Sequence, residues 1–131
     1  MILAQVTGAI FGALLANAMF NRTLVELSET ARSGNSLLIG EVVATAGLIF
    51  TILMAIYNNK PQTLSWVVPL WIGGAYFFTS SSSFANPAVT VGRSLSNSFA
   101  GIEPSSALQF IVAQFVGAFI GLALANNLRN K

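Results

Sequence analysis

The stretch Thr79–Val89, with the sequence TSSSSFANPAV, decides how this chain is expected to fold. It lies inside an uncharged run, Pro61–Gly92, whose 32 residues exceed the roughly 20 that one membrane span needs. The serines are polar, Asn86 is a residue type that caps helices, and Pro87 suits a first helical position. These signals predict that one helix ends before the serines and that a second, short helix begins at Pro87.

The composition favours a membrane protein of a single domain. Of the 131 residues, 54% are hydrophobic and only 8% are charged, whereas a soluble domain carries about 25% charged residues. So few charged side chains cannot cover a water-facing surface, but lipid contact removes that requirement. The net charge of +2, without a Lys/Arg cluster, does not indicate nucleic-acid binding.

Residue types that carry most enzyme chemistry are missing. The sequence contains no Cys, no His and no Asp, and only four Glu. That excludes a cysteine nucleophile, a histidine base, a disulfide and a zinc site built from Cys and His. We therefore expect no enzyme activity, no metal and no cofactor. The first 21 residues are uncharged and lack the basic start of a signal peptide.

Charged residues divide the chain into four long stretches, which are uncharged except for Glu41 near the start of the second. They predict an all-α membrane protein with spanning helices at residues 2–20, 38–57, 64–80 and 106–126. The apolar segment from Pro87 to about Asn97 crosses only half a membrane, which suggests a re-entrant half-helix lining a cavity. An exposed serine-rich loop followed by a surface helix is the open alternative.

The distribution of positive charge predicts the orientation. Arg129 and Lys131 in the tail, together with Lys60, place the tail and the loop near residue 60 in the cytoplasm. Alternation then places the loop Arg22–Ser36 outside. The prediction is a multi-pass protein of the cell membrane with a cytoplasmic C-terminus.

The first and last hydrophobic stretches repeat each other. Residues 4–17 and 113–126 match at eight of fourteen positions, and each copy holds a Gly-x-x-x-Gly pattern that lets helices approach closely. The glycines are Gly8, Gly12, Gly117 and Gly121. The copies lie three spans apart and so have opposite orientations, as in inverted-repeat channels and transporters.

This repeat predicts one partial domain over 1–131. Residues 1–20 are interpreted as the last helix of a first repeat, and 37–131 as a complete second repeat. The first two helices of repeat one have no counterpart, so we expect either a truncated reading frame or a chain that pairs with another.

Together these segments resemble the aquaporin, or major intrinsic protein, family over most of the chain. The third, fourth, fifth and sixth family spans are matched, in that order, by Ala4–Ala9, Gly40-Glu41, Leu64–Thr79 and Gln114–Gly121. The second signature loop is matched by Ser83–Ala88. The family's first Asn-Pro-Ala loop is absent from the sequence. The resemblance implies a tetramer in a lipid bilayer, with one pore per subunit and no cofactor.

The resemblance also implies pore residues at the second loop. Asn86, Pro87 and Ala88 would start a half-helix whose positive end, with the Asn86 amide, faces passing solutes. The alternative is that Asn86 simply caps a helix. The family usually has Arg after this tripeptide, where the sequence has Val89.

The other filter positions fall on Ser83 and Gly74, so with Val89 the implied constriction is broad and largely apolar. Such a filter predicts passage of glycerol, urea, water or neutral metalloids. A Val at this position resembles the residue that certain bacterial members associated with arsenic resistance have there. This resemblance implies neutral arsenite or methylated arsenicals as the solutes.

Two charged residues are interpreted as structural support. In the family a Glu at the position of Glu41 accepts backbone hydrogen bonds that hold the re-entrant loop; the alternative is favourable placement at a helix start. Arg93 lies one turn past Val89, on the same helical face. It either restores part of the missing charge near the outer mouth or, as we prefer, snorkels or binds loop carbonyls.

The leading prediction of function is a passive channel for small neutral solutes. The alternative is a truncated, non-conducting protein or an assembly partner of a full-length relative. A secondary transporter is a third possibility, because broken helices and inverted repeats also occur there.

Overall fold

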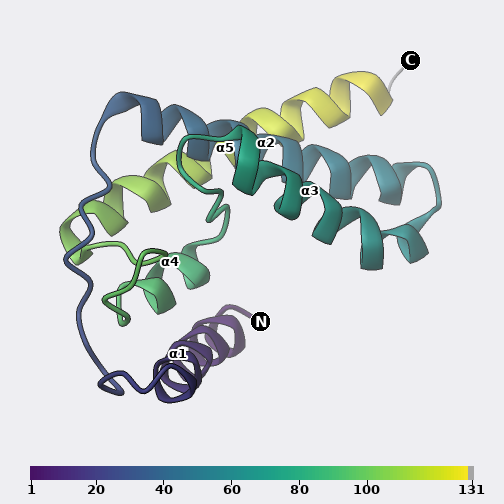
Figure 1. Cartoon of the computed structure of the whole chain (residues 1–131). Coiled ribbons are helices and arrows are strands. Elements are labelled where there is room, and N and C mark those ends of the chain that lie inside the picture. Colours follow the sequence, from purple (N-terminus) through teal and green to yellow (C-terminus); the bar gives the residue numbers. More distant parts are fainter. Residues whose placement is uncertain (130–131) are drawn as a thin grey trace. The chain divides into compact units, whose positions relative to one another are not determined.

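The computed structural model describes residues 1–129, which form helices and irregular segments without a strand. Lys131, used above to orient the tail, lies outside the described residues. The elements are α1 (Ile2–Met19), α2 (Asn35–Tyr57), the 3₁₀ turn η1 (Pro61–Thr63), α3 (Leu64–Phe78), α4 (Pro87–Arg93) and α5 (Pro104–Arg129), as Figure 1 shows. The all-α prediction is confirmed.

Three helices are long and apolar enough to cross a membrane: α1, α2 and α5, with 18, 23 and 26 residues. The fourth predicted span, α3, has 15 residues, or about 22 Å at 1.5 Å per residue, which is short of a hydrocarbon core of about 30 Å. It ends two residues before the predicted position 80 because Thr79 is extended, with φ −101° and ψ 142°. The turn η1 lengthens α3 at its start. Because α1, α2 and α5 are each long and apolar enough to cross a bilayer, the chain is a multi-pass membrane protein.

The described residues form two compact units, each drawn from both halves of the chain. The first combines Met1–Ser33 with Asn86–Ile111, and the second combines Gly34–Ala85 with the chain from Val112. These boundaries differ from the predicted repeat boundaries, since α1 shares its unit with α4. The assignment of residues 37–131 to one complete repeat stays a prediction.

In the first unit, α4 packs against α1 at a glycine. A Cβ at Gly92 would lie 2.7 Å from the carbonyl oxygen of Ala9, closer than real Cβ contacts come. In the same unit, hydrogen bonds join the segment 20–33 to the segment 94–103. Asn17, the only buried residue of α1, donates from Nδ2 to the Leu24 and Leu95 carbonyl oxygens at 3.0 and 3.1 Å.

In the second unit, the Gly-x-x-x-Gly pattern of α5 packs on α2. A Cβ at Gly117 would lie 2.5 Å from the Val42 carbonyl oxygen, and one at Gly121 would collide with the Ala46 carbonyl oxygen. The close approach predicted for this copy is confirmed. The other copy differs, because no described atom lies within 4 Å of a Cβ built at Gly8 or Gly12.

Helices α2 and α3 also pack directly on each other within the second unit (Figure 1). The indole ring of Trp71 fills the space beside Gly47 that a side chain would otherwise take. Its Nε1 donates to the Ala44 carbonyl oxygen at 2.9 Å. Turn η1 therefore closes a helical hairpin whose two arms are joined by both packing and a hydrogen bond.

Candidate functional site

A buried carboxylate holds the segment between α3 and α4. Glu41 of α2 is fully buried, and its Oε1 accepts from the Ser81 hydroxyl at 2.7 Å and the Phe84 backbone N–H at 2.8 Å. Its Oε2 accepts from the Ala85 N–H at 3.0 Å and from Gln114 Nε2 at 2.8 Å. Four donors satisfy the buried charge, which would otherwise be costly inside a membrane. This is the geometry that the predicted support role requires; the role itself stays a prediction.

The same segment has an unusual backbone. Ser82, Ser83 and Ala85 have φ of 62°, 46° and 49°, in the left-handed region that costs a non-glycine residue about 1–2 kcal/mol. The bonds from Phe84 and Ala85 to Glu41 offset that cost. The Ser83 hydroxyl is buried and has no hydrogen-bond partner among residues 1–129. The segment thus contains a buried hydroxyl whose hydrogen-bonding capacity is not used by the described residues.

The start of α4 is fixed by a capped asparagine. Asn86 is extended, with φ −157° and ψ 123°, and its Oδ1 accepts from the Ala88 N–H at 2.8 Å. Pro87 occupies the first helical position. The sequence prediction that a short helix begins there is confirmed. The cap requires that Oδ1 of Asn86 faces the helix, so Nδ2 of the same side chain points away from the helix. This Nδ2 donates to no residue within 1–129.

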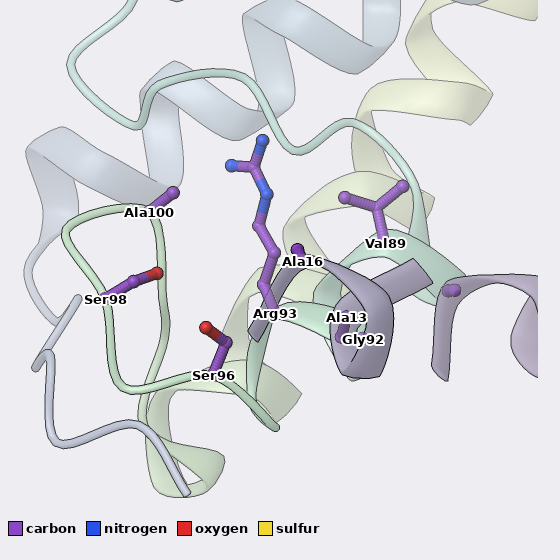
Figure 2. Close-up of a pocket in the computed structure, with 9 residues that line it drawn as sticks. Ala13, Ala16, Val89, Gly92, Arg93, Ser96, Ser98 and Ala100 are labelled. Atoms are coloured by element: carbon purple, nitrogen blue, oxygen red, sulfur yellow. The ribbon is translucent and has the colours of Figure 1, made fainter. Parts of the chain in front are cut away.

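A hollow of about 310 Å³ lies between α1, α4 and the segment after α4 in the first unit (Figure 2). Its walls are mainly small and apolar, and Val89 and Arg93 both line it, as expected for residues four apart on one helix. Figure 2 shows the Arg93 side chain extending from α4 between Val89 and Ala100. The lining residues are Ala9, Ala13, Ala16, Val89, Gly92, Arg93, Ser96, Ser98 and Ala100.

A second hollow of about 390 Å³ shares part of this lining. Both are bordered by Ala16, Ser96, Ser98 and Ala100, so the two hollows are neighbours in the first unit. The second hollow adds Arg22, whose Nη1 donates to the Asn97 carbonyl oxygen. Its further lining residues are Asn17, Phe20 and Phe99. No acidic residue lines either hollow.

The predicted site residues divide between the two units. Asn86 to Val89 and Arg93 belong to the first, whereas Glu41, Gly74 and Ser83 belong to the second. Gly74 lies on α3 with open space beside it, since a Cβ there would meet only the Phe78 ring at 3.8 Å. The grouping of Val89 with Ser83 and Gly74 in one filter therefore stays a prediction.

The sequence did not indicate the residues that join the segments 20–33 and 94–103 of the first unit. Arg32 is buried and donates from Nε to the Gly101 carbonyl oxygen at 2.7 Å and from Nη2 to the Phe99 carbonyl oxygen at 2.9 Å. Asn17 also accepts from the Ser96 hydroxyl at 2.6 Å. The Ala-Asn ending shared by both repeat copies is a sequence signal for Asn17. No such signal marks Arg32, which sits in a segment of zero net charge.

Residues 1–129 contain no group of three His, Cys, Asp or Glu side chains able to hold a metal ion. What the described side chains of the first unit offer at the start of α4 is a hydrogen-bond donor, the Asn86 amide. Donors without an adjacent nucleophile or base can bind and orient a solute oxygen.

Comparison with known proteins shows a bacterial relative. The chain is 43% identical over 123 residues to the aquaglyceroporin AqpS of Rhizobium meliloti (strain 1021). The match covers 94% of this chain and 52% of the relative, so the chain spans about half the length of the curated relative it matches. No family model matches the chain. No solved structure matches it either.

Proposed function

Because the chain belongs to the aquaporin, or major intrinsic protein, family and corresponds to its C-terminal portion, we propose that it forms part of a passive channel for small neutral solutes. Its solutes are glycerol, water, urea and neutral metalloids such as arsenite. The name of its relative, an aquaglyceroporin, supports glycerol. Passive conduction requires no cofactor, because solutes move down their own gradient.

The orientation of Asn86 is the observation that carries this proposal. Its Oδ1 is committed to the Ala88 N–H, so its Nδ2 is held as a hydrogen-bond donor at the positive end of α4. Such a donor binds the oxygen of a neutral solute in passing, while the helix end repels cations and protons.

The side chain of Val89 supports solutes larger than water. It lines the hollow together with alanines of α1, and neither residue type narrows a passage or binds water strongly. A glycerol molecule presents both an apolar CH face and hydroxyl groups. A wall of small apolar residues with a few donors suits both parts of such a molecule.

A non-conducting assembly partner is the alternative function. The chain holds a single Asn-Pro-Ala, at 86–88, and α1 buries only Asn17, leaving a large apolar surface for a second chain or lipid. We propose a homo-oligomer, a tetramer by the resemblance, with the C-terminus in the cytoplasm. Stopped-flow measurement of glycerol and water flux into proteoliposomes separates conduction from the alternative.

The sharpest variant for this assay is Asn86→Asp. It keeps the Oδ1 acceptor that caps α4 but replaces the amide donor with a negative oxygen, so α4 is retained while the solute contact is lost. We expect glycerol flux to fall by about tenfold, the effect of losing one well-placed donor. Asn97→Asp, whose Oδ1 likewise accepts from a backbone N–H, that of Glu29 at 3.1 Å, is the matched control. Wild-type flux no greater than that of empty liposomes would contradict conduction by this chain.

A further inference from the structure

The two copies of the internal repeat differ in the side that they bury, although the residues on that side are identical. Helix α5 buries five of the fourteen shared positions: Ala113, Gln114, Gly117, Gly121 and Ala125. The equivalent residues of α1 are of the same types and are all exposed; they are Ala4, Gln5, Gly8, Gly12 and Ala16, which we term the open face. Only three of the other nine positions are identical. The matching residues are thus concentrated on one helix face, which the described residues cover in α5 and leave bare in α1.

Helix α2 covers this face in α5. Gln114 donates from Nε2 to Oε2 of Glu41 at 2.8 Å. A Cβ at Gly117 or at Gly121 would collide with a backbone carbonyl oxygen of α2, which is that of Ala46 in the second case. The contacts advance from Glu41 to Ala46 along α2 and from Gln114 to Gly121 along α5, so the two helices run parallel. A hydrogen bond to a carboxylate thus accompanies a close approach of two backbones.

In α1 the same elements have no partner among the described residues. No atom of residues 1–129 lies within 4 Å of a Cβ built at Gly8 or Gly12. The Gln5 side chain makes no hydrogen bond within the same residues. Helix α4 packs on a neighbouring side of α1, because its Gly92 lies against the backbone of Ala9, about 100° around the helix from Gly8. The described part of the chain therefore leaves the open face accessible.

From this difference we infer that the open face is a docking site for a further apolar membrane helix that resembles α2. That helix carries a carboxylate beside Gln5, brings its backbone against Gly8 and Gly12, and runs parallel to α1. Close van der Waals contact between backbones and hydrogen bonds between side chains are the interactions that join helices in lipid. These contacts require no linking segment, so the helix can bind as a separate molecule.

The described residues do not supply this helix. Among the described helices only α2 contains a carboxylate, and Glu41 already accepts hydrogen bonds from four donors of its own unit. The match to the aquaglyceroporin leaves about half of that protein's length uncovered, which is room enough for a span of about 20 residues. We therefore expect the docking helix to come from outside residues 1–131.

A peptide with the sequence of α2, Asn35–Tyr57, is the probe for this docking site. The full chain contains no cysteine, so Leu3→Cys provides a single thiol for a donor dye on the exposed side of α1 opposite Gly12. In neutral detergent, energy transfer to an acceptor dye on the peptide measures binding. If the helices are parallel, an N-terminal acceptor lies about 6 Å along the helix from the donor and a C-terminal acceptor about 27 Å. Transfer should therefore be stronger to the N-terminal acceptor.

Three substitutions by leucine in α1 test the open face. Gly12→Leu fills the place of the incoming backbone and should raise the dissociation constant of the peptide at least about tenfold. Gln5→Leu removes the hydrogen-bond donor and should raise this constant about fivefold. Thr7→Leu is the matched control, because Thr7 and its equivalent Val116 are both exposed; the constant should then stay within about twofold of the wild-type value.

A peptide with Glu41→Gln tests the carboxylate itself. It should bind the wild-type chain about fivefold more weakly than the unchanged peptide does. Against Gln5→Leu, the same change in the peptide should cause no further loss, because the pair is already broken. A further loss of similar size would show that Gln5 and the carboxylate are not partners, which would overturn the inference.

The docking site is also overturned if the peptide does not bind the wild type, if Gly12→Leu binds it equally well, or if transfer is stronger to the C-terminal acceptor. Gly12→Leu should keep the Tm of the chain, because Gly12 has no described neighbour. If that variant does not fold, Gln5→Leu with the two peptides still decides the test.

A second copy of this chain is the competing occupant. Transfer between donor-labelled and acceptor-labelled chains that is lost in Gly12→Leu and unaffected by the peptide would identify that occupant and overturn the inference. Absence of such transfer, with peptide binding that depends on Gly12, would support it. Binding is measured without flux, so this inference and the proposed function can fail separately.

Discussion

Replacing Glu41 with Gln tests whether the buried carboxylate holds the segment 81–85. The substitution preserves size and shape but leaves one acceptor oxygen where two now accept four hydrogen bonds. With the amide oxygen toward Ser81 and Phe84, the new NH₂ group faces the Ala85 N–H. That buried N–H then loses its partner, whereas Gln114 can turn its own amide oxygen to accept.

The cost follows from the four bonds. Hydrogen bonds to a charged acceptor contribute about 1.5–3 kcal/mol and neutral ones about 0.5–1.5 kcal/mol, so three retained bonds weaken by about 3 kcal/mol together. One unpaired buried N–H adds about 1–3 kcal/mol. Relief from burying a charge offsets part of this sum. We expect a net loss of about 3 kcal/mol, equivalent to a Tm lower by about 10 °C for a chain of this length.

Thermal unfolding in detergent measures this effect, with Glu103→Gln as the matched control. The Glu103 side chain accepts one hydrogen bond, from Ser106, and is only half-buried, so the same substitution should cost less than about 1 kcal/mol. Equal Tm shifts in the two variants would refute the reasoning. So would a Glu41→Gln protein as stable as the wild type.

Two further predictions use contacts within single units. Gly121→Ala should destabilise the chain by about 1–3 kcal/mol, because the added Cβ collides with α2. Gly12→Ala, at the equivalent position of the other repeat copy, should be neutral. Equal losses of Tm in the two variants would show that α1 is packed as closely as α5. Arg32→Lys keeps the charge but loses the guanidinium group that donates to two carbonyl oxygens at once. Amide hydrogen exchange across residues 99–101 should therefore become about tenfold faster, which corresponds to the loss of one charged hydrogen bond. Unchanged exchange there would mean that other contacts hold the segment.

Much of the fold was predictable because its signals are local. The uncharged stretches indicated the helices, and the Ser run with Asn86 and Pro87 indicated the break and the start of α4. The cap needs only the neighbouring Ala88 N–H, so a tripeptide contains all the information required. The end of α3 was placed two residues late because Thr79 and Ser80 are compatible with a helix in isolation.

The site was less predictable because its contacts connect distant residues. The four donors to Glu41 lie 40 to 73 residues away in sequence, and only the family resemblance suggested its backbone bonds. The partners of Arg32 lie 67 and 69 residues away, and nothing in its own segment indicates them. The open face at Gly8 and Gly12 could not be anticipated either, since the repeat gives both copies the same motif.

The partners of Glu41 have a consequence for how the protein is made. Synthesis runs from the N-terminus, so α2 emerges before Ser81, and long before Gln114, both of which donate to its carboxylate. A charge at the centre of a helix opposes membrane insertion by about 2.5–3.5 kcal/mol. Glu41 lies in the second turn of α2, so its cost is smaller, but the apolar remainder of α2 must outweigh it on its own. Helix α2 therefore enters the bilayer with an unmet charge near its start, at residue 41, and is expected to keep that end in contact with water or the insertion machinery until α5 has been translated.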